Sequence, residues 1–146
     1  MGDRPALKAV GYWREAGSRR WPRPQWLVRP GWHVEDRARI VTYLRSGHER
    51  ASWLGCSFCR FGCGVDERLL GCRDLTDGEW VWPEGLAHYV EAHSVFLPEP
   101  LVDTIRAHGW RVPEQVTVPP DDAEPDFSVW EEWVCRHRRR PWYGFW

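Results

Sequence analysis

Three cysteines lie within CSFCRFGCG (residues 56–64), and two histidines follow in HYVEAH (residues 88–93). Cysteine thiolates and imidazoles are the ligands that Zn²⁺ prefers, and a structural site holds four of them in a tetrahedron. A short turn brings two sulfurs together, and Gly64, directly after Cys63, lets backbone N–H groups turn toward the sulfur. The pattern predicts a metal site that joins a cysteine-bearing turn to a histidine-bearing helix.

More residues could bind this metal than a tetrahedron accepts. On an ideal helix His88 and His93 point about 140° apart, so they do not converge on one ion. Either the last helical turn loosens, or the two imidazoles approach the ion from opposite sides, or His93 binds alone and Cys72 completes a three-cysteine site. The spacing also differs from that of a DNA-reading finger, because 24 residues separate Cys63 from His88. The six candidates are Cys56, Cys59, Cys63, Cys72, His88 and His93.

CRFGCG together with LTDGEWVWPEGLAHYVEAH resembles a signature of small uncharacterised bacterial proteins. In these proteins a cysteine knuckle precedes a Trp-Pro helix start and two histidines. The resemblance covers about residues 59–97 and carries no biochemical activity. Because there are more candidate ligands than places, we expect a closed, structural site with one Zn²⁺ per chain. If the knuckle is distorted, Cys56 is the nearest alternative ligand. The ligands that the resemblance implies are Cys59, Cys63, His88 and His93.

The remaining patterns predict an α+β fold. Apolar residues at helical spacing predict a helix over residues 34–46, whose buried stripe is Val34, Ala38, Val41 and Leu44. Gly47 ends this helix, and RASWLG (residues 50–55) reads as a short strand. We expect a small zinc-bound knuckle, a β-hairpin and a helix as the core, flanked by further helices and Trp-rich extended arms.

The second half of the chain contains clear turn and helix signals. Residues 69–82 read as a hairpin with its turn at Asp77-Gly78. Pro83 is expected as the first residue of the helix that carries the histidines. Residues 97–109 predict another helix, with Leu101, Val102 and Ile105 inside and Gly109 at its end. Ser128 and Glu131 form a capping box for a last helix that ends before Pro141.

Composition divides the chain into four parts. Residues 1–33 are an Arg-, Trp- and Pro-rich arm, and residues 34–118 hold the zinc-binding α+β core. Residues 119–126 (PPDDAEPD) are an acidic, Pro-rich linker, and residues 127–146 hold the C-terminal helix and an aromatic tail. There is no run of 18 apolar residues, so no membrane span is predicted.

Further Cys, His and Glu side chains are candidates for packing, hydrogen bonding or catalysis. Cys135 is interpreted as a buried packing residue, and Cys72, if it is not a ligand, as a packed or spare thiol. His33, His48, His108 and His137 are expected to make ordinary hydrogen bonds. Glu91 suggests the alternative of a zinc-dependent hydrolase. However, HYVEAH is neither His-Glu-x-x-His nor its inverse, and Glu91 is expected to face solvent.

We expect a binding or adaptor protein of the bacterial cytoplasm that acts through protein–protein contacts and is not an enzyme. The N-terminal region lacks an apolar export segment, so the thiols are expected to be reduced. With 12 Trp, the chain has ample material for binding hot spots. The aromatic tail either inserts into a partner or docks back on its own domain. Its aromatic residues are Trp142, Tyr143, Phe145 and Trp146.

The alternative function is nucleic-acid binding through the N-terminal arm. Aromatic rings among cations are typical of sites that bind single strands. The opposing interpretation is that the arm packs on the core, because residues 1–50 carry a formal charge of +6 and residues 51–127 carry −9. The residues of the candidate nucleic-acid surface are Arg19, Arg20, Trp21, Arg23 and Trp26.

Overall fold

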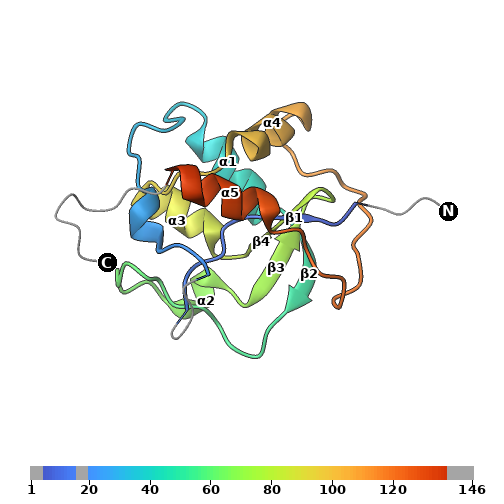
Figure 1. The fold of residues 1–146 in the computed structure, drawn as a ribbon, viewed down its shortest axis with the longest axis horizontal. Coiled ribbons are helices and arrows are strands. Elements are labelled where there is room, and N and C mark those ends of the chain that lie inside the picture. The colour runs from blue at the N-terminus through green and yellow to red at the C-terminus, as the bar shows by residue number, and fades with distance from the viewer. Residues whose placement is uncertain (1–4, 16–19, 138–146) are drawn as a thin grey trace.

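Four short strands form one mixed sheet in the order β1-β4-β3-β2 (Figure 1). A computed structural model describes residues 5–15 and 20–137. The β2–β3 and β3–β4 pairs are antiparallel, whereas β1 is parallel to β4. The α+β class is thereby confirmed. The strands are β1 (Lys8–Ala9), β2 (His48–Ser52), β3 (Arg73–Thr76) and β4 (Trp80–Pro83).

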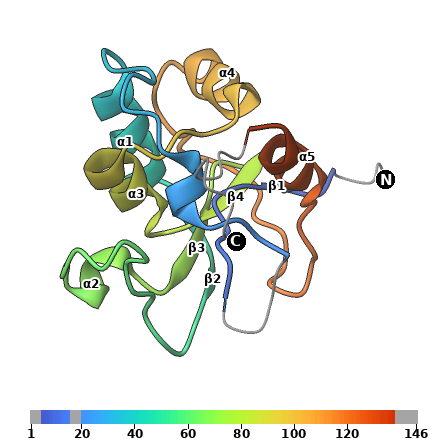
Figure 2. The same ribbon diagram turned by 60° about the vertical axis from the view of Figure 1, so that its left-hand side comes forward.

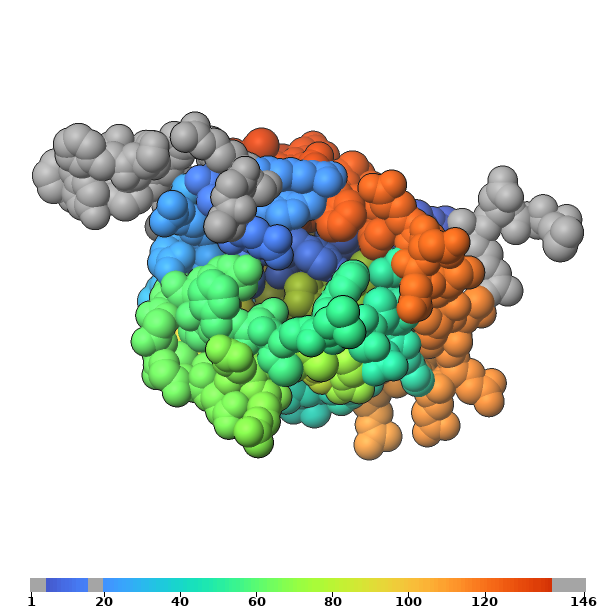
Figure 3. All heavy atoms as spheres, turned by 90° about the horizontal axis from the view of Figure 1, so that it is seen from below, coloured from blue at the N-terminus to red at the C-terminus, as the bar shows by residue number. Residues whose placement is uncertain are grey.

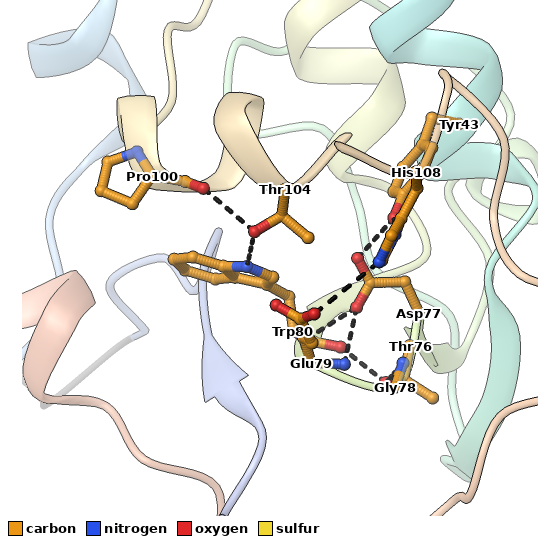
Figure 4. A network of polar contacts seen from close by, with 9 residues as sticks. All are labelled: Tyr43, Thr76, Asp77, Gly78, Glu79, Trp80, Pro100, Thr104 and His108. Carbon is orange, nitrogen blue, oxygen red and sulfur yellow. Dashed lines mark hydrogen bonds and ion pairs between the residues drawn. The ribbon is translucent and has the colours of Figure 1, made fainter. Parts of the chain in front are cut away.

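The turn between β3 and β4 lies at Asp77-Gly78, as predicted. The Asp77 Oδ1 atom accepts the backbone N–H groups of Glu79 and Trp80 at 2.9 and 2.7 Å. Gly78 has φ +94°, a left-handed value that favours glycine. The Tyr43 hydroxyl donates to Asp77 Oδ2 at 2.6 Å, which joins the turn to the neighbouring helix (Figure 4).

Pro83 ends β4 and does not begin the next helix, so that prediction was wrong. It lies opposite Asp74 in the β3–β4 register. The Glu84 N–H donates to the Arg73 carbonyl at 2.8 Å and extends the pairing beyond Pro83. Proline fits such a position because the next N–H supplies the hydrogen bond. The helix α3 spans Leu86–His93.

Helices α1, α3 and α4 lie together, and α5 packs against β1 on another part of the sheet (Figure 2). The Trp82 indole N–H donates to the Leu44 carbonyl at 2.9 Å and joins β4 to α1. Leu101, Val102 and Ile105 of α4 are buried, as predicted. The other helices are the 3₁₀ turn η1 (Pro24–Leu27), α1 (Arg37–Arg45), α2 (Glu67–Leu70), α4 (Glu99–Ala107) and α5 (Ser128–His137).

The buried stripe of α1 differs from the prediction. The helix starts at Arg37 because His33 has a left-handed backbone, φ +41°, and turns the chain before it. Val34 therefore precedes the helix and is 63% exposed, and Ala38 is exposed as well. The stripe that packs inward is Ile40, Val41, Tyr43 and Leu44.

Two further element boundaries needed correction. The first two residues of the predicted hairpin, Leu69 and Leu70, belong instead to the end of α2, which is capped by the Asp66 side chain. The expected Ser128–Glu131 capping box is replaced by Asp126, whose carboxylate accepts the Ser128 N–H at 2.9 Å. Glu131 N–H instead bonds to the Phe127 carbonyl at 2.9 Å, because the helix begins before the expected cap.

The N-terminal segment forms part of the core. Trp13, Trp26 and Trp32 are only 6–7% exposed and belong to the same hydrophobic cluster as α1, α3 and β4. Residues 119–126 form no helix, and Asp126 exchanges backbone hydrogen bonds of 2.8 Å with Leu7 and Ala9 beside β1. Among the described residues, none of the helices combines the length and hydrophobicity that a bilayer crossing requires.

Candidate metal centre

The cysteine-bearing turn and α3 bring four metal-binding side chains together. The Cys59 Sγ atom lies 3.3 Å from His93 Nε2, and Cys63 Sγ lies 3.4 Å from His88 Nε2. All four donor atoms lie within 4.8 Å of one another. Among residues 5–15 and 20–137, this is the one cluster of His, Cys, Asp and Glu side chains that could hold a metal ion.

These separations suit a tetrahedral zinc ion. Bonds of about 2.3 Å to sulfur and about 2.0 Å to nitrogen place tetrahedral ligand atoms about 3.3–3.8 Å apart. The two measured sulfur–nitrogen distances, 3.3 and 3.4 Å, fall in or near this range. The widest separation, at most 4.8 Å, needs a contraction of about 1 Å, which side-chain rotation supplies. The four residues that the family resemblance implied are therefore compatible with one zinc ion.

Both histidines of α3 reach the cluster although they lie five positions apart. An α-helix closes each turn between residues i and i−4. The helix continues through His93, and a wider turn follows it, in which the Ser94 N–H bonds to the Tyr89 carbonyl, five residues back, and the Val95 N–H bonds to the same carbonyl at 3.2 Å. The ring centroids of His88 and His93 are 5.1 Å apart. The cluster therefore contains both imidazoles and not Cys72.

Two glycines shape the cysteine turn. The Gly62 N–H donates to the Cys59 carbonyl at 3.0 Å and closes a four-residue turn. Gly62 and Gly64 have φ values of +64° and +79°, which side chains rarely adopt. The backbone can therefore reverse twice around Cys63 and present its sulfur on the same side as that of Cys59.

Tyr89 fastens this turn to α3. Its hydroxyl accepts the Arg60 N–H at 3.0 Å and donates to the Phe58 carbonyl at 3.3 Å. Both bonds lie directly beside Cys59, so they fix the position of its backbone. Sequence reasoning missed this role of Tyr89, because a tyrosine in a helix gives no sign of where its hydroxyl points.

Phe61 is a second supporting residue that sequence reasoning missed. Its ring stacks on the His93 imidazole with 4.1 Å between ring centroids and 8° between planes. The stacking restricts rotation of the imidazole and covers one of its faces. The sequence shows that Phe61 lies between two cysteines. It does not show which ring Phe61 contacts, because that depends on how the turn docks on the helix.

Burial and charge favour the metal-binding forms of the histidines. Burial lowers the pKa of His88, and the neighbouring His93 lowers it further. Burial also lowers the pKa of His93. Both imidazoles are therefore neutral near pH 7, the form that binds metal. Cys59 is 7% exposed, whereas Cys63 lies at the surface, so the cluster forms part of the protein's exterior.

The three remaining cysteines lie outside this cluster. Cys56 and Cys72 do not belong to the four-residue cluster; instead they lie beside each other. Cys135 is exposed on α5, so the prediction of a buried packing residue was wrong. The helix turns Cys135 away from the stripe that buries Trp130, Trp133 and Val134.

Glu91 and the four histidines outside the cluster make the contacts that the sequence predicted. Glu91 is exposed and accepts two bonds from Arg45, at 2.9 and 3.2 Å, which lower the pKa of its carboxyl. It therefore faces solvent, as predicted. Each of the four other histidines makes a hydrogen bond: His33 with Glu99, His48 with Pro113, His108 with Tyr43 and His137 with Trp133.

The two tryptophans of the candidate nucleic-acid surface lie against arginines. Trp26 is buried beneath the Arg14 guanidinium, whose carbon lies 4.9 Å from the ring centroid. Arg20 lies over Trp21 at 4.2 Å and pairs with Glu131 of α5 at 3.0 Å. Bases stack on exposed ring faces, so Trp26 offers none, whereas Trp21 is half-buried. Nucleic-acid binding through this arm stays a prediction. Arg23 is exposed, while Arg19 and the aromatic tail at residues 142–146 lie outside the described residues.

Comparison of the chain with protein-family models, with curated proteins and with solved structures gives no match. The assignment of the site as a candidate metal centre therefore depends on the geometry of its side chains.

Proposed function

We propose that Cys59, Cys63, His88 and His93 bind one structural Zn²⁺, and that the protein acts as an adaptor through protein–protein contacts. The observation that carries the metal site is the gathering of two sulfurs and two imidazole nitrogens within 4.8 Å. Four protein ligands fill a tetrahedron, whereas a catalytic zinc keeps one position for water. The ion would fasten the cysteine turn to α3.

A metal is needed here because few other contacts hold the turn. Residues 53–58 and 60–69 are exposed or half-buried throughout, and Cys59 is the buried residue among them. A segment with so little burial gains little hydrophobic stabilisation. The ion would add to the few attachments that the segment has, which are the Tyr89 bonds, the Gln25 bond to the Arg60 carbonyl at 2.6 Å and the packing of Phe61 and Val65 against the core.

The adaptor role is supported by apolar side chains that this segment exposes. Isolated exposed apolar residues are common, but several of them in one segment of a soluble protein indicate an interaction surface. We name this set the knuckle surface. It consists of Trp53 (58% exposed), Leu54 (112%), Phe58 (60%) and Leu69 (72%).

Substitution of the ligands tests the metal. His93→Ala and Cys63→Ser should unfold the region of residues 53–70, measured as faster amide hydrogen exchange there. The matched control is His48→Ala, which removes an imidazole that bonds only to the Pro113 carbonyl. Retention of native exchange rates in metal-free His93→Ala protein would contradict a structural role for the ion.

Substitution of the knuckle surface tests the adaptor role. Leu54→Arg should abolish cross-linking of a native-cell partner, because it places a charge in the proposed contact. Val34→Arg is the control, since Val34 is 63% exposed and lies near the start of α1. If both variants keep the same partner as the unaltered protein, the knuckle surface is not the contact.

A further inference from the structure

The structure holds a second pair of cysteines, Cys56 and Cys72, next to the metal cluster but outside it. The Trp53 N–H donates to the Cys72 carbonyl at 2.7 Å, and the Ser57 N–H donates to the Gly71 carbonyl at 3.2 Å. The Trp53–Cys72 bond continues the β2–β3 register by one position, and residues 54–56 form an extra loop before Ser57 meets Gly71. Cys56 and Cys72 are the chain neighbours of the two residues that the Ser57–Gly71 bond joins, and each thiol is close enough to feel the other's charge.

This proximity is compatible with a disulfide. The Ser57–Gly71 bond holds the two segments together one residue away from each thiol. Disulfides join Cα atoms about 4.4–6.8 Å apart. The Cys72 N–H is taken by Glu84 Oε1 at 3.1 Å, so it does not bond to Cys56. Gly71, at φ +73°, leaves room for Glu84 at this position, because a Cβ there would meet the Glu84 side chain at 1.7 Å.

Small molecules can reach the pair. Cys56 is exposed and Cys72 is half-buried, and both line a cavity of about 510 Å³. Figure 3 shows this hollow between the N-terminal segment, in blue, and the green segment that carries the cysteines. The charged residues of its lining, Arg60, Arg73, Glu15 and Asp74, balance one another.

We propose that Cys56 and Cys72 are a redox-active dithiol, which a low-molecular-weight disulfide oxidises to an intramolecular cross-link. The Cys56 thiolate attacks one sulfur of the reagent R–S–S–R, and one R–S⁻ leaves and takes up a proton. The Cys72 thiol then loses its proton and attacks the Cys56 sulfur of the mixed disulfide, which releases the second R–S⁻. Two electrons pass from the protein to the reagent, which becomes two R–SH molecules.

The cross-link would act on the knuckle surface. Trp53 and Leu54 lie three and two residues before Cys56, so a bond from Cys56 to Cys72 fixes their segment against the start of β3. Partial desolvation and interactions with Cys72, Glu67 and Glu84 raise the pKa of Cys56. Cys56 therefore holds its proton near neutral pH, and its attack on the reagent quickens as the pH rises.

The test uses the full-length chain with Cys135→Ser, which removes a solitary exposed thiol. Zinc-supplied protein is treated with glutathione disulfide, alkylated with iodoacetamide and mapped by peptide mass spectrometry. We expect two fewer alkylated thiols, a Cys56–Cys72 linked peptide and no retained glutathione. A stable glutathione adduct on Cys56 beside an alkylated Cys72, or a link from Cys56 to Cys59 or Cys63, would overturn the proposal.

A second variant tests the role of the Cys72 thiol, and a second condition separates this proposal from the metal site. Cys72→Ser should retain glutathione on Cys56, because no thiol remains to displace it. The experiment is repeated after treatment with a chelator. If the protein binds no zinc, glutathione modifies Cys59 and Cys63 in both conditions, yet the Cys56–Cys72 link is still expected.

Discussion

Phe61 stacks face to face on His93, with 4.1 Å between their ring centroids and 8° between their planes. The contact joins the cysteine turn to the last residue of α3. Phe61 lies between Cys59 and Cys63 in the chain, so the ring that orients one ligand comes from the turn that carries two others. The turn and the helix therefore position each other's ligands.

Phe61→Ala should weaken metal binding without abolishing it. The His93 imidazole would gain rotational freedom that binding must then remove, and loss of such outer contacts lowers metal affinity about 10–100-fold. Competition with a chromophoric chelator measures the affinity. Phe58→Ala is the control, because Phe58 is 60% exposed. Equal affinities for the two variants would count against a positioning role for Phe61.

Tyr89→Phe should destabilise the turn by about 1–3 kcal/mol, because the Arg60 N–H loses its acceptor. The ring and its packing are retained, so a change reports on the hydroxyl alone. Urea unfolding with and without zinc gives the free energy. The loss should be larger without zinc, since the ion is then absent as a second attachment. A loss that is the same in both conditions would show that the bond and the ion act independently.

Asp77→Ala should cost about 3 kcal/mol or more, because the carboxylate accepts two turn N–H groups and the Tyr43 hydroxyl. Tyr43→Phe removes only the last of these and should cost about 1–2 kcal/mol. Thermal or urea unfolding compares the two variants. A larger loss for Tyr43→Phe would mean that the contact with α1, and not the turn, dominates.

Stability should fall above about pH 10. Burial and the hydrogen bond to Asp77 raise the pKa of Tyr43 above its ordinary value. The folded protein therefore keeps this proton while the unfolded chain loses it, so the stabilisation is full below about pH 10 and is lost as pH rises further. Urea unfolding between pH 8 and 11 should show a shallower decline for Tyr43→Phe. An identical decline would show that Tyr43 ionises equally in both states.

Local signals in the sequence predicted much of the hairpin and of the metal cluster. Asp77-Gly78 marks a tight turn through its own side chain and backbone, so it needs no distant partner. The four clustered ligands followed from a family resemblance, whereas ideal helix geometry argued against the convergence of His88 and His93. The side-chain positions that bring the two imidazoles together depend on how the cysteine turn packs on α3, which has no clear sequence signal.

Features that depend on distant contacts were not predictable in the same way. β1 has two residues and pairs in parallel with β4, more than 70 positions later, so no turn announces it. The burial of Trp13 and Trp26 likewise depends on the helices that cover them. The position of Cys135 on α5 leaves it exposed, whereas cysteine as a residue type is usually buried.

The metal content of the purified full-length protein, measured by plasma mass spectrometry after growth without added chelator, tests the central claim most directly. We predict about one zinc per chain for the unaltered protein and for Cys72→Ser, and little or none for Cys63→Ser and His93→Ala. Unaltered protein that is folded and carries no stoichiometric metal would contradict the account.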